Sequence, residues 1–464
     1  MIRTSLLCCV LLSIPGVAAA QADEPPLEGY YRLRGRLASG ETYRGAARIV
    51  AGERGPELIV QREGRREAFR APLRKARAGF LFRAEGSAGL ADRVGVAAEE
   101  QIRLEARIRR RGERLLSRWR LTAGERVLAR GSEELRKPAT SPGQVYLSLS
   151  VDWEGRDLTD ENLGAMERFR ERFPTLPLTH FLNAAYYTKP GARGVDVTRQ
   201  ILRALRPDDE RGLHLHGWRS LFEAAGVAYR AGPTFWGAGR PPTPCAGDEG
   251  HEVEVSAYTC AELRRVVAYS KSRLAEAGLK VGGSFRAGGW VAPRNVIEAV
   301  RAEGLAVDAS AVPARWHDEL RGTALLGRLE QLWATIQPTT QPYFEATPQG
   351  QVLRMIDTGA LADYVSADEM VAHVERALQR RATNPSRDIY VHLGFHQETA
   401  ARYLPRLQRA LERLLAKSDP HLVIETLAGS ARRLVGEAKV ALARAPRKHR
   451  EEDGIPLPAW DREE

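Results

Sequence analysis

The chain has 464 residues, of which 43% are hydrophobic and 28% charged, with a formal net charge of +11. This composition excludes a mostly disordered chain, and the length exceeds one ordinary domain, so we expect two or three domains. The chain carries no recognisable nucleic-acid-binding motif, so its basic charge does not indicate a nucleic-acid partner.

Residues 1–20 predict a secretory signal peptide. Arg3 gives the positive end, the run from Ser5 to Val17 is apolar, and Ala18 begins a group of small residues suited to cleavage. The apolar run is too short to span a bilayer comfortably, and no later segment is long and apolar enough. We therefore expect a periplasmic or secreted protein without a stable membrane span.

Two cysteines remain after such a signal is removed, namely Cys245 and Cys260. In an oxidising compartment, two cysteines fifteen positions apart can close one loop, which predicts a disulfide bond. Two free thiols are the alternative.

Residues 27–137 predict an all-β domain, either a barrel or a sandwich. Apolar and charged residues alternate clearly over 101–108, and glycine-containing turns recur about every ten residues. Further strands are expected at 30–37, 42–50, 57–62, 114–121 and 126–131.

The predicted β domain contains the whole charge excess of the chain, with 27 Lys and Arg against 15 Asp and Glu, a net charge of +12. It has no histidine and no cysteine, which favours an accessory or binding role over catalysis. A basic domain indicates an anionic partner such as an acidic polysaccharide, and a merely solvated arginine-rich surface is the alternative.

Residues 138–143 are a plausible linker, and the pattern changes after them. Over 144–430, short apolar strands alternate with helical stretches, which is typical of a βα-repeating domain with parallel strands. Residues 431–464 predict a basic helix and a loose tail. The expected strands are 145–152, 178–183, 212–216, 281–286, 306–310, 352–357, 389–396 and 421–425. The expected helices are 159–172, 195–205, 261–277, 293–302, 367–381, 399–416 and 430–446.

Two of these strands end in an ionisable residue on the less apolar face. Residues 145–152 end in Asp152, and residues 389–396 end in His396, with valine, leucine, isoleucine and phenylalanine on the opposite face. Barrels of parallel strands build their sites at the carboxyl ends of the strands, so both residues are candidates for a site.

A third strand supplies His214 and His216, which share a face because they lie two positions apart. Two imidazoles with a carboxylate from another strand suit a zinc-type site, where a metal-bound water becomes more acidic. Two structural histidines are the alternative. Arg286 ends a further strand, where it can orient a carboxylate or form a structural ion pair.

Four segments occur in a characteristic order: Ser-Val-Asp-Trp-Glu-Gly, Gly-Leu-His-Leu-His, Phe-Arg-Ala-Gly-Gly-Trp and Leu-Gly-Phe-His. Together they resemble the polysaccharide deacetylase superfamily, which includes carbohydrate esterase family four, over residues 143–430. The resemblance implies a distorted (β/α)7 barrel. It also implies metal-dependent removal of N- or O-acetyl groups from a polysaccharide.

The resemblance also implies a role for each matching residue. Asp152 becomes the general base, His214 a metal ligand, Arg286 the group that tethers the base, and His396 the general acid. Asp308 is expected to be a second acidic partner in the site.

The chain departs from the family pattern at two metal positions. Trp153 stands where the family has a second aspartate, so either Glu154 or Asp152 binds the metal, or the site has none. Trp218 stands where the second metal histidine is expected, which leaves His216 and His251 as candidates. Three tryptophans near the motifs are expected to contact sugar rings: Trp153, Trp218 and Trp290.

The leading hypothesis is an exported carbohydrate deacetylase with a divalent metal, expected to be zinc. A glycoside hydrolase is an alternative, because Asp152 or Glu154 with Asp308 offers the two carboxylates that it needs. A non-catalytic polysaccharide-binding or export factor is the other alternative, since the first two motifs are altered.

Overall fold

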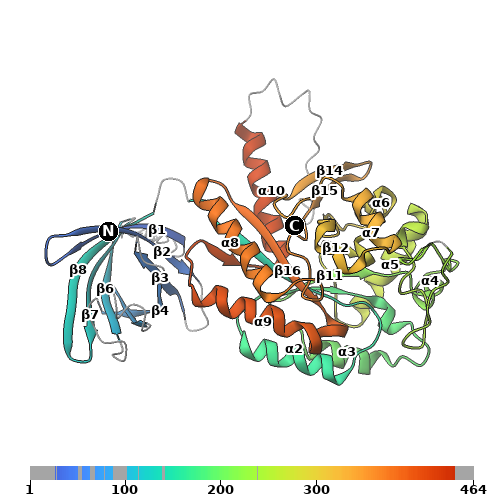
Figure 1. The fold of residues 1–464 in the computed structure, drawn as a ribbon, viewed down its shortest axis with the longest axis horizontal. Coiled ribbons are helices and arrows are strands. Elements are labelled where there is room, and N and C mark those ends of the chain that lie inside the picture. Colours follow the sequence, from blue (N-terminus) through green and yellow to red (C-terminus); the bar gives the residue numbers. More distant parts are fainter. Residues whose placement is uncertain are drawn as a thin grey trace, which may run out of the picture.

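The computed structural model places the chain in two domains, a small β-barrel and a larger α/β domain (Figure 1). The predicted signal, most of the predicted linker and the end of the tail lie outside the described residues. The described residues are 27, 29–50, 55–62, 68–77, 79–86, 102–112, 114–137, 142–237 and 239–444.

The first domain is a closed barrel in which each antiparallel strand pairs with the next, and β1 pairs with β8. The alternating sequence explains this, because in β6 and β7 every second side chain is buried in one apolar core. The strands are β1 (Gly29–Leu37), β2 (Thr42–Val50), β3 (Glu57–Arg62), β4 (Ala68–Ala76), β5 (Gly79–Gly86), β6 (Ile102–Arg111), β7 (Arg114–Ala123) and β8 (Arg126–Arg136).

Polar side chains inside the barrel form a short chain of hydrogen bonds. The indole N–H of Trp119 donates to the hydroxyl of Tyr43 over 2.8 Å, and this hydroxyl donates to the Glu133 carboxylate over 2.7 Å. Glycine is required opposite these rings, because a Cβ at Gly35 would lie 2.0 Å from the Tyr43 ring. The barrel core is therefore filled by its own side chains near this chain of bonds.

The second domain is built on a curled sheet whose parallel strands run in the order β15-β13-β12-β11-β10-β9-β16. β14 pairs antiparallel at one edge, and β17 pairs with the start of β9. The strands are β9 (Val145–Asp152), β10 (Thr179–Leu182), β11 (Glu210–Leu215), β12 (Ser284–Ala287), β13 (Val307–Asp308), β14 (Tyr343–Thr347), β15 (Gly350–Arg354), β16 (Ile389–His396) and β17 (Leu422–Ile424).

The expected closed barrel of seven strands is matched in part. The strands curl with helices outside them (Figure 1), but the regular sheet is open between β15 and β16. Chain after β15 approaches β16 there, through an isolated parallel bridge between Leu361 and Gly394. The backbone N–H of Ala362 also donates to the carbonyl of Gly394 over 2.8 Å.

All helices but the last cover this sheet with apolar side chains that belong to its main core. The last helix instead packs Leu427 and Ala431 against Tyr146 and Tyr390 in a separate core. Capping residues fix where they begin: Thr259 and Ser366 each form a capping box with a glutamate three positions later. The helices are α2 (Asp160–Arg172), α3 (Gly194–Leu202), α4 (Arg219–Ala224), α5 (Cys260–Glu276), α6 (Arg294–Ala302), α7 (Ala324–Leu332), α8 (Ala367–Thr383), α9 (Ala400–Ala416) and α10 (Leu427–Arg444). Within the described residues, none of the helices combines the length and apolar character needed to cross a bilayer.

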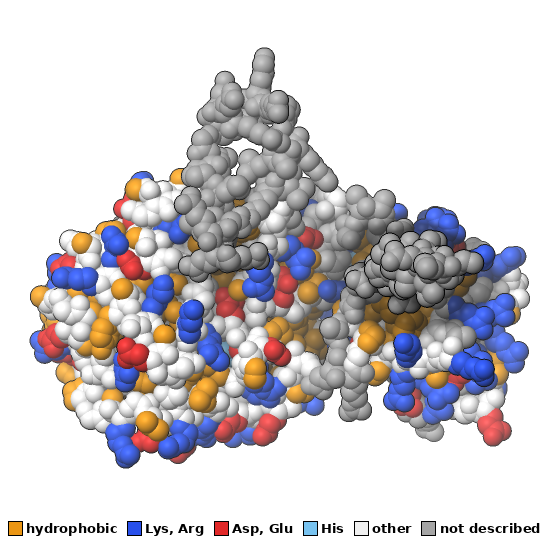
Figure 2. Space-filling model, turned by 180° about the vertical axis from the view of Figure 1, so that it is seen from behind, with side chains coloured by type: hydrophobic (Ala, Val, Ile, Leu, Met, Phe, Trp, Pro, Cys, Tyr) orange, Lys and Arg blue, Asp and Glu red, His pale blue; other side chains and the backbone are white. Residues whose placement is uncertain are grey.

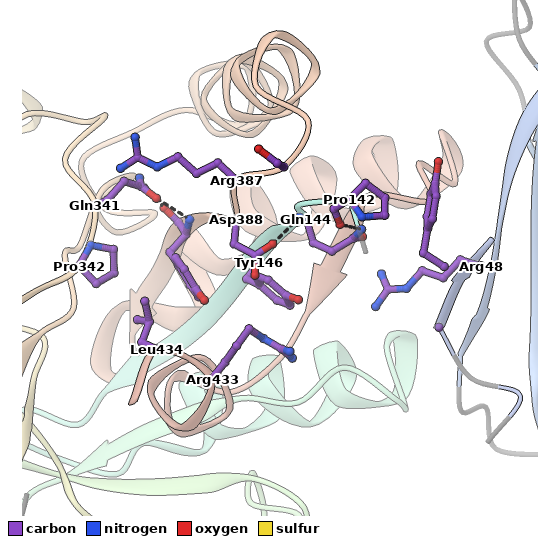
Figure 3. A pocket seen from close by; sticks show the side chains of 14 residues that line it. Arg48, Pro142, Gln144, Tyr146, Gln341, Pro342, Arg387, Asp388, Arg433 and Leu434 are labelled. Atoms are coloured by element: carbon purple, nitrogen blue, oxygen red, sulfur yellow. Dashed lines mark hydrogen bonds between the residues drawn. The ribbon is translucent and has the colours of Figure 1, made fainter. Parts of the chain in front are cut away.

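The two domains meet near the amino ends of β9 and β16. The ring of Tyr30 stacks on that of His421 with centroids 5.0 Å apart, and Arg48 donates to the carbonyl of Leu422 over 3.2 Å. A cleft of about 710 Å³ opens beside these contacts (Figure 3). Arg48 reaches it from the barrel, and Tyr146, near the start of β9, lines it from the other domain.

The predicted disulfide bond is wrong in this structure, because both cysteines are free thiols. They lie in different surroundings: Cys245 is close to Arg156 and Lys189, whereas Cys260 begins α5 and is close to Glu298. Sequence spacing alone does not bring two thiols within bonding distance.

Candidate active site

A cavity of about 360 Å³ lies at the carboxyl ends of the parallel strands. Asp152 ends β9 and lies opposite His396, the last residue of β16, because the two strands pair in register along their whole length. β11 and the loop after it bring further imidazoles to the same cavity. Lining residues with ionisable side chains include Asp152, Glu154, His214, His216, His251 and His396.

Glu154 is the centre of this cluster. Its carboxylate oxygens lie 3.0 Å from Nε2 of His214, 2.6 Å from Nε2 of His216 and 2.8 Å from Nε2 of His251. The backbone of Glu154 is fixed from behind, since the indole N–H of Trp218 donates to its carbonyl over 2.8 Å. Three imidazoles from two segments therefore face one nearly buried carboxylate.

The orientation of two imidazoles is set by backbone carbonyls. Nδ1 of His214 lies 2.9 Å from the carbonyl of Arg286, and Nδ1 of His216 lies 2.6 Å from the carbonyl of His251. A carbonyl only accepts, so each Nδ1 carries the proton, and a neutral ring directs its Nε2 lone pair at Glu154. Lone pairs and a carboxylate that converge in this way fit a divalent metal ion, because the ion replaces their repulsion with attraction.

Two overlapping groups of three could hold such an ion, and within each group the ligand atoms lie within 4.8 Å of one another. They are Glu154 with His216 and His251, and Asp152 with Glu154 and His214. Burial, together with the neighbouring His216, lowers the pKa of His251 to about 4, so this ring is neutral at neutral pH and able to bind metal. Burial alone would raise the pKa of Glu154, but the charge of the His216 and His214 rings, when they are protonated, holds it well below its ordinary value. Protons or a metal ion must therefore offset this buried carboxylate.

Asp152 is held by Arg286, as expected for a tethered carboxylate. One guanidinium nitrogen of Arg286 donates to both carboxylate oxygens of Asp152, over 2.9 Å and 3.2 Å, and to the hydroxyl of Ser150 over 2.9 Å. Its Nε donates to the carbonyl of Ala309 over 2.9 Å. Since Arg286 is only 1% exposed, its charge acts on Asp152 with little screening by water.

A buried group below Arg286 was not anticipated from the sequence. Nδ1 of His392 lies 2.7 Å from a carboxylate oxygen of Asp357, and Nε2 of His392 lies 2.9 Å from the Ser150 hydroxyl. The indole N–H of Trp290 donates to the other oxygen of Asp357 over 3.0 Å. Burial raises the pKa of Asp357, but His392 and Arg286 outweigh burial and lower it. This group fixes Arg286 from the side away from the cavity.

His396 has a carboxylate partner of its own, Asp363, which the sequence pattern does not reveal. Nδ1 of His396 lies 3.0 Å from this carboxylate, and Nε2 lies 3.7 Å from Glu154. Burial alone would lower the pKa of His396, but Asp363 and then Glu154 raise it to about 10. At neutral pH this imidazole is therefore a proton donor aimed at the cavity.

Asp308 is not part of the site, and its predicted role as an acidic partner is wrong. It is fully buried and pairs with Arg354 over 2.6 Å, because β13 and β15 place these two residues opposite each other. It also accepts a hydrogen bond from the Ser310 hydroxyl over 2.6 Å. Asp357 and Asp363 are the carboxylates that support the site instead.

Two of the three predicted sugar-contacting tryptophans are also wrong. Trp153 and Trp218 are both 0% exposed. Trp153 donates to His180 over 3.1 Å, and Trp218 supports the Glu154 backbone. Trp290 does line the cavity, and the exposed Trp236 lines it from the long loop between α4 and α5.

Glycine beside Trp290 makes room for the imidazole of His216. A Cβ at Gly288 would lie 2.5 Å from the ring of His216, and Gly289 adopts a positive φ of 60° in contact with Phe235. The Gly-Gly-Trp segment therefore follows from close packing as well as from its position at the end of β12.

No protein-family model and no curated protein matches the chain. Among solved structures, the chain is similar to a candidate polysaccharide deacetylase from Mycobacterium smegmatis, with 12% identity, a TM-score of 0.39, and coverage of 65% of this chain and 96% of that one. It is similar to the Puue allantoinase, with 14% identity, a TM-score of 0.38, and coverage of 62% and 90%. It is also similar to a family 4 carbohydrate esterase from Streptomyces lividans in complex with acetate, with 11% identity, a TM-score of 0.29, and coverage of 61% and 92%. Likeness at this level does not bear on activity.

Proposed function

We propose that the protein is an exported, divalent-metal-dependent deacetylase that hydrolyses N- or O-acetyl groups of a polysaccharide. One observation carries this proposal: a metal-type donor set, a tethered carboxylate and a protonated imidazole face the same cavity. Hydrolysis of an acetyl group needs these three elements, a site for the carbonyl, a base for water and an acid for the leaving group.

The metal belongs to Glu154 and the surrounding imidazoles of His214, His216 and His251, which fit zinc best by their chemistry. When bound, a divalent ion polarises the acetyl carbonyl and lowers the pKa of water. Asp152 is the carboxylate closest to this group that has a separate charged partner, which favours a role as base rather than as ligand.

Three side chains of the protein itself then move or hold protons. Arg286 holds the carboxylate of Asp152 in place, and Asp152 accepts the proton of the attacking water. His396 donates its Nε2 proton to the departing nitrogen or oxygen, while Asp363 holds Nδ1 and stabilises the charged ring. Trp290 and Phe235 exclude water from the inner wall of the cavity.

The test is acetate release from acetylated polysaccharides by purified protein, with and without chelator and added zinc. We expect acetate release that the chelator abolishes and zinc restores, with no shortening of the polymer. Shortened chains without acetate would instead support the glycoside hydrolase, and binding without either product would support the non-catalytic factor. Asp152→Asn and His214→Ala, compared beside the native chain, tie the activity to this cavity.

A further inference from the structure

The outer face of the β-barrel bears a groove of about 1010 Å³ that crosses β5, β6, β7, β8 and β1. Figure 2 shows Lys and Arg side chains gathered on the barrel. Arg34 and Arg36 on β1, Arg107 and Arg109 on β6, and Arg118 on β7 line this groove, and all five are exposed. We call this surface the arginine groove.

Strand register places like charges directly opposite each other on this barrel. Arg107 on β6 faces Arg118 on β7, and Arg34 on β1 faces Arg44 on β2, while on its other side Arg34 faces Glu134 on β8. Opposed like charges on neighbouring strands destabilise a sheet, and a barrel that only needed to fold would gain from glutamate at one of each pair. The sequence therefore retains an electrostatic cost that a bound anion would relieve.

Nearby carboxylates do not neutralise the groove. Glu105 is engaged by Arg83 and Arg120, at 3.0 Å and 3.4 Å, and Glu134 by Arg114 and Arg136. Among the residues that the structure describes, no carboxylate pairs with the groove members Arg34, Arg107, Arg109 and Arg118. The positive field of the groove is thus free to act on a partner.

The groove also lies away from the catalytic cavity. The barrel touches the α/β domain through Tyr30 and Arg48, near the amino ends of β9 and β16, whereas the catalytic cavity lies at their carboxyl ends. Arg34 and Arg36 lie farther along β1 than Tyr30. A ligand that reaches both places must be long.

We propose that the arginine groove binds an acidic polysaccharide, carrying uronic-acid carboxylates, and retains this polymer while the α/β domain removes its acetyl groups. The polymer's identity as the substrate rests on the proposed function, while its negative charge rests on the groove. Guanidinium groups bind carboxylates through paired hydrogen bonds, and the opposed Arg107 and Arg118 on neighbouring strands lie about 5 Å apart, close to the length of one sugar unit. Leu116, 37% exposed among the arginines, offers an apolar contact to sugar rings.

The test compares Arg107→Gln/Arg118→Gln with a matched control, Arg168→Gln/Arg409→Gln, which removes the same charge from exposed sites on α2 and α9. The probe is polyuronate binding by the full chain at two salt concentrations. We expect the groove variant to bind about tenfold more weakly, with a smaller salt dependence, and the control to bind as the native chain does. The melting temperature of the groove variant should stay the same or rise, because the substitutions remove a repulsive pair of arginines.

Equal binding by the groove variant and the native chain would overturn the proposal. So would equal binding of a neutral polysaccharide, or tighter binding to duplex DNA or anionic vesicles than to polyuronate. Acetate release from a short acetylated oligosaccharide, measured on the same samples, separates the two proposals. Polyuronate binding without acetate release contradicts only the deacetylase, whereas release without charge-dependent binding contradicts only the groove.

Discussion

The two domains place their charges in opposite ways. In the α/β domain, several charged side chains are buried and paired: Arg286 and Asp152 are 1% and 2% exposed, and Arg354 and Asp308 are 3% and 0% exposed. In the barrel, the interior is almost wholly apolar, and arginines crowd the outer face opposite one another. Buried, converging charges suit chemistry on one small group, whereas exposed and unbalanced charges suit retention of a long polymer.

The largest effect is expected from Glu154→Gln, which removes the carboxylate at the centre of the donor set. Loss of a metal that polarises a carbonyl removes several kcal/mol of transition-state stabilisation, so acetate release should fall about a thousandfold or more. Steady-state kinetics on acetylated substrate measure this. If the variant retained more than about a tenth of native activity, the chemistry would not depend on Glu154.

The variant Asp152→Asn tests whether Asp152 acts as the general base or as a metal ligand. As a base, Asp152 contributes about 10²- to 10⁴-fold to the rate, so the variant should lose that much kcat while it still binds metal. As a ligand in the group with Glu154 and His214, it would lose metal as well. Parallel measurement of kcat and metal content distinguishes the two roles.

The residues of this site that could be predicted from the sequence are those that lie in or next to regular strands. Asp152, His214 and His396 end or lie in regular strands, and His216 directly follows one, so alternation and strand position indicated that they share one edge. His251 comes from a long loop, and the resemblance to a family made it a candidate.

The residues that the sequence did not reveal lie in irregular chain. Asp357 and Asp363 follow β15 on the segment that approaches β16, and no periodic pattern fixes the path of that segment. His392 could have been predicted to face the site, because it shares the inward face of β16 with His396. The prediction that Asp308 belongs to the site was wrong because β13 has only two residues, too few for alternation to indicate the direction of a side chain.

The strands of the fold were also predictable where apolar and polar residues alternate regularly, and not predictable elsewhere. The expected strands 145–152 and 389–396 match β9 and β16 residue for residue, since long apolar alternation defines both. β4, β5 and β14 were missed, because their sequences are rich in alanine, arginine or polar residues and alternate weakly. Their existence depends on neighbouring strands that pair with them.

Asp308→Ala tests the distinction between structural and catalytic charges in the α/β domain. It leaves Arg354 with only its more exposed partner Glu345, so we expect a loss of about 3 kcal/mol in the free energy of unfolding. The kcat of the folded variant should be unchanged. Urea unfolding and kinetics below the transition measure both, and a large loss of kcat without a loss of stability would return Asp308 to the site.

Asp363→Asn should change the pH dependence more than the rate. Because Asp363 raises the pKa of His396, its removal should lower that pKa by about one unit or more. The proton donor is then lost at lower pH, so the alkaline limb of the kcat profile shifts downward while activity near neutral pH falls little. An unmoved alkaline limb would show that His396 is not the acid.

The smallest effect is expected from reductant. Since Cys245 and Cys260 are free thiols in the structure, dithiothreitol should change the melting temperature by no more than about 1 °C. A larger fall, measured by calorimetry on protein purified without reductant, would indicate that the two cysteines do form a bond.

Metal content of the purified chain tests the central claim most directly, measured by elemental mass spectrometry beside Glu154→Gln and Asp308→Asn. We predict about one divalent ion per chain in the native protein and in Asp308→Asn, whose carboxylate lies outside the cavity, and almost none in Glu154→Gln. Equal metal in all three, or none in the native protein after zinc is supplied, would contradict the account.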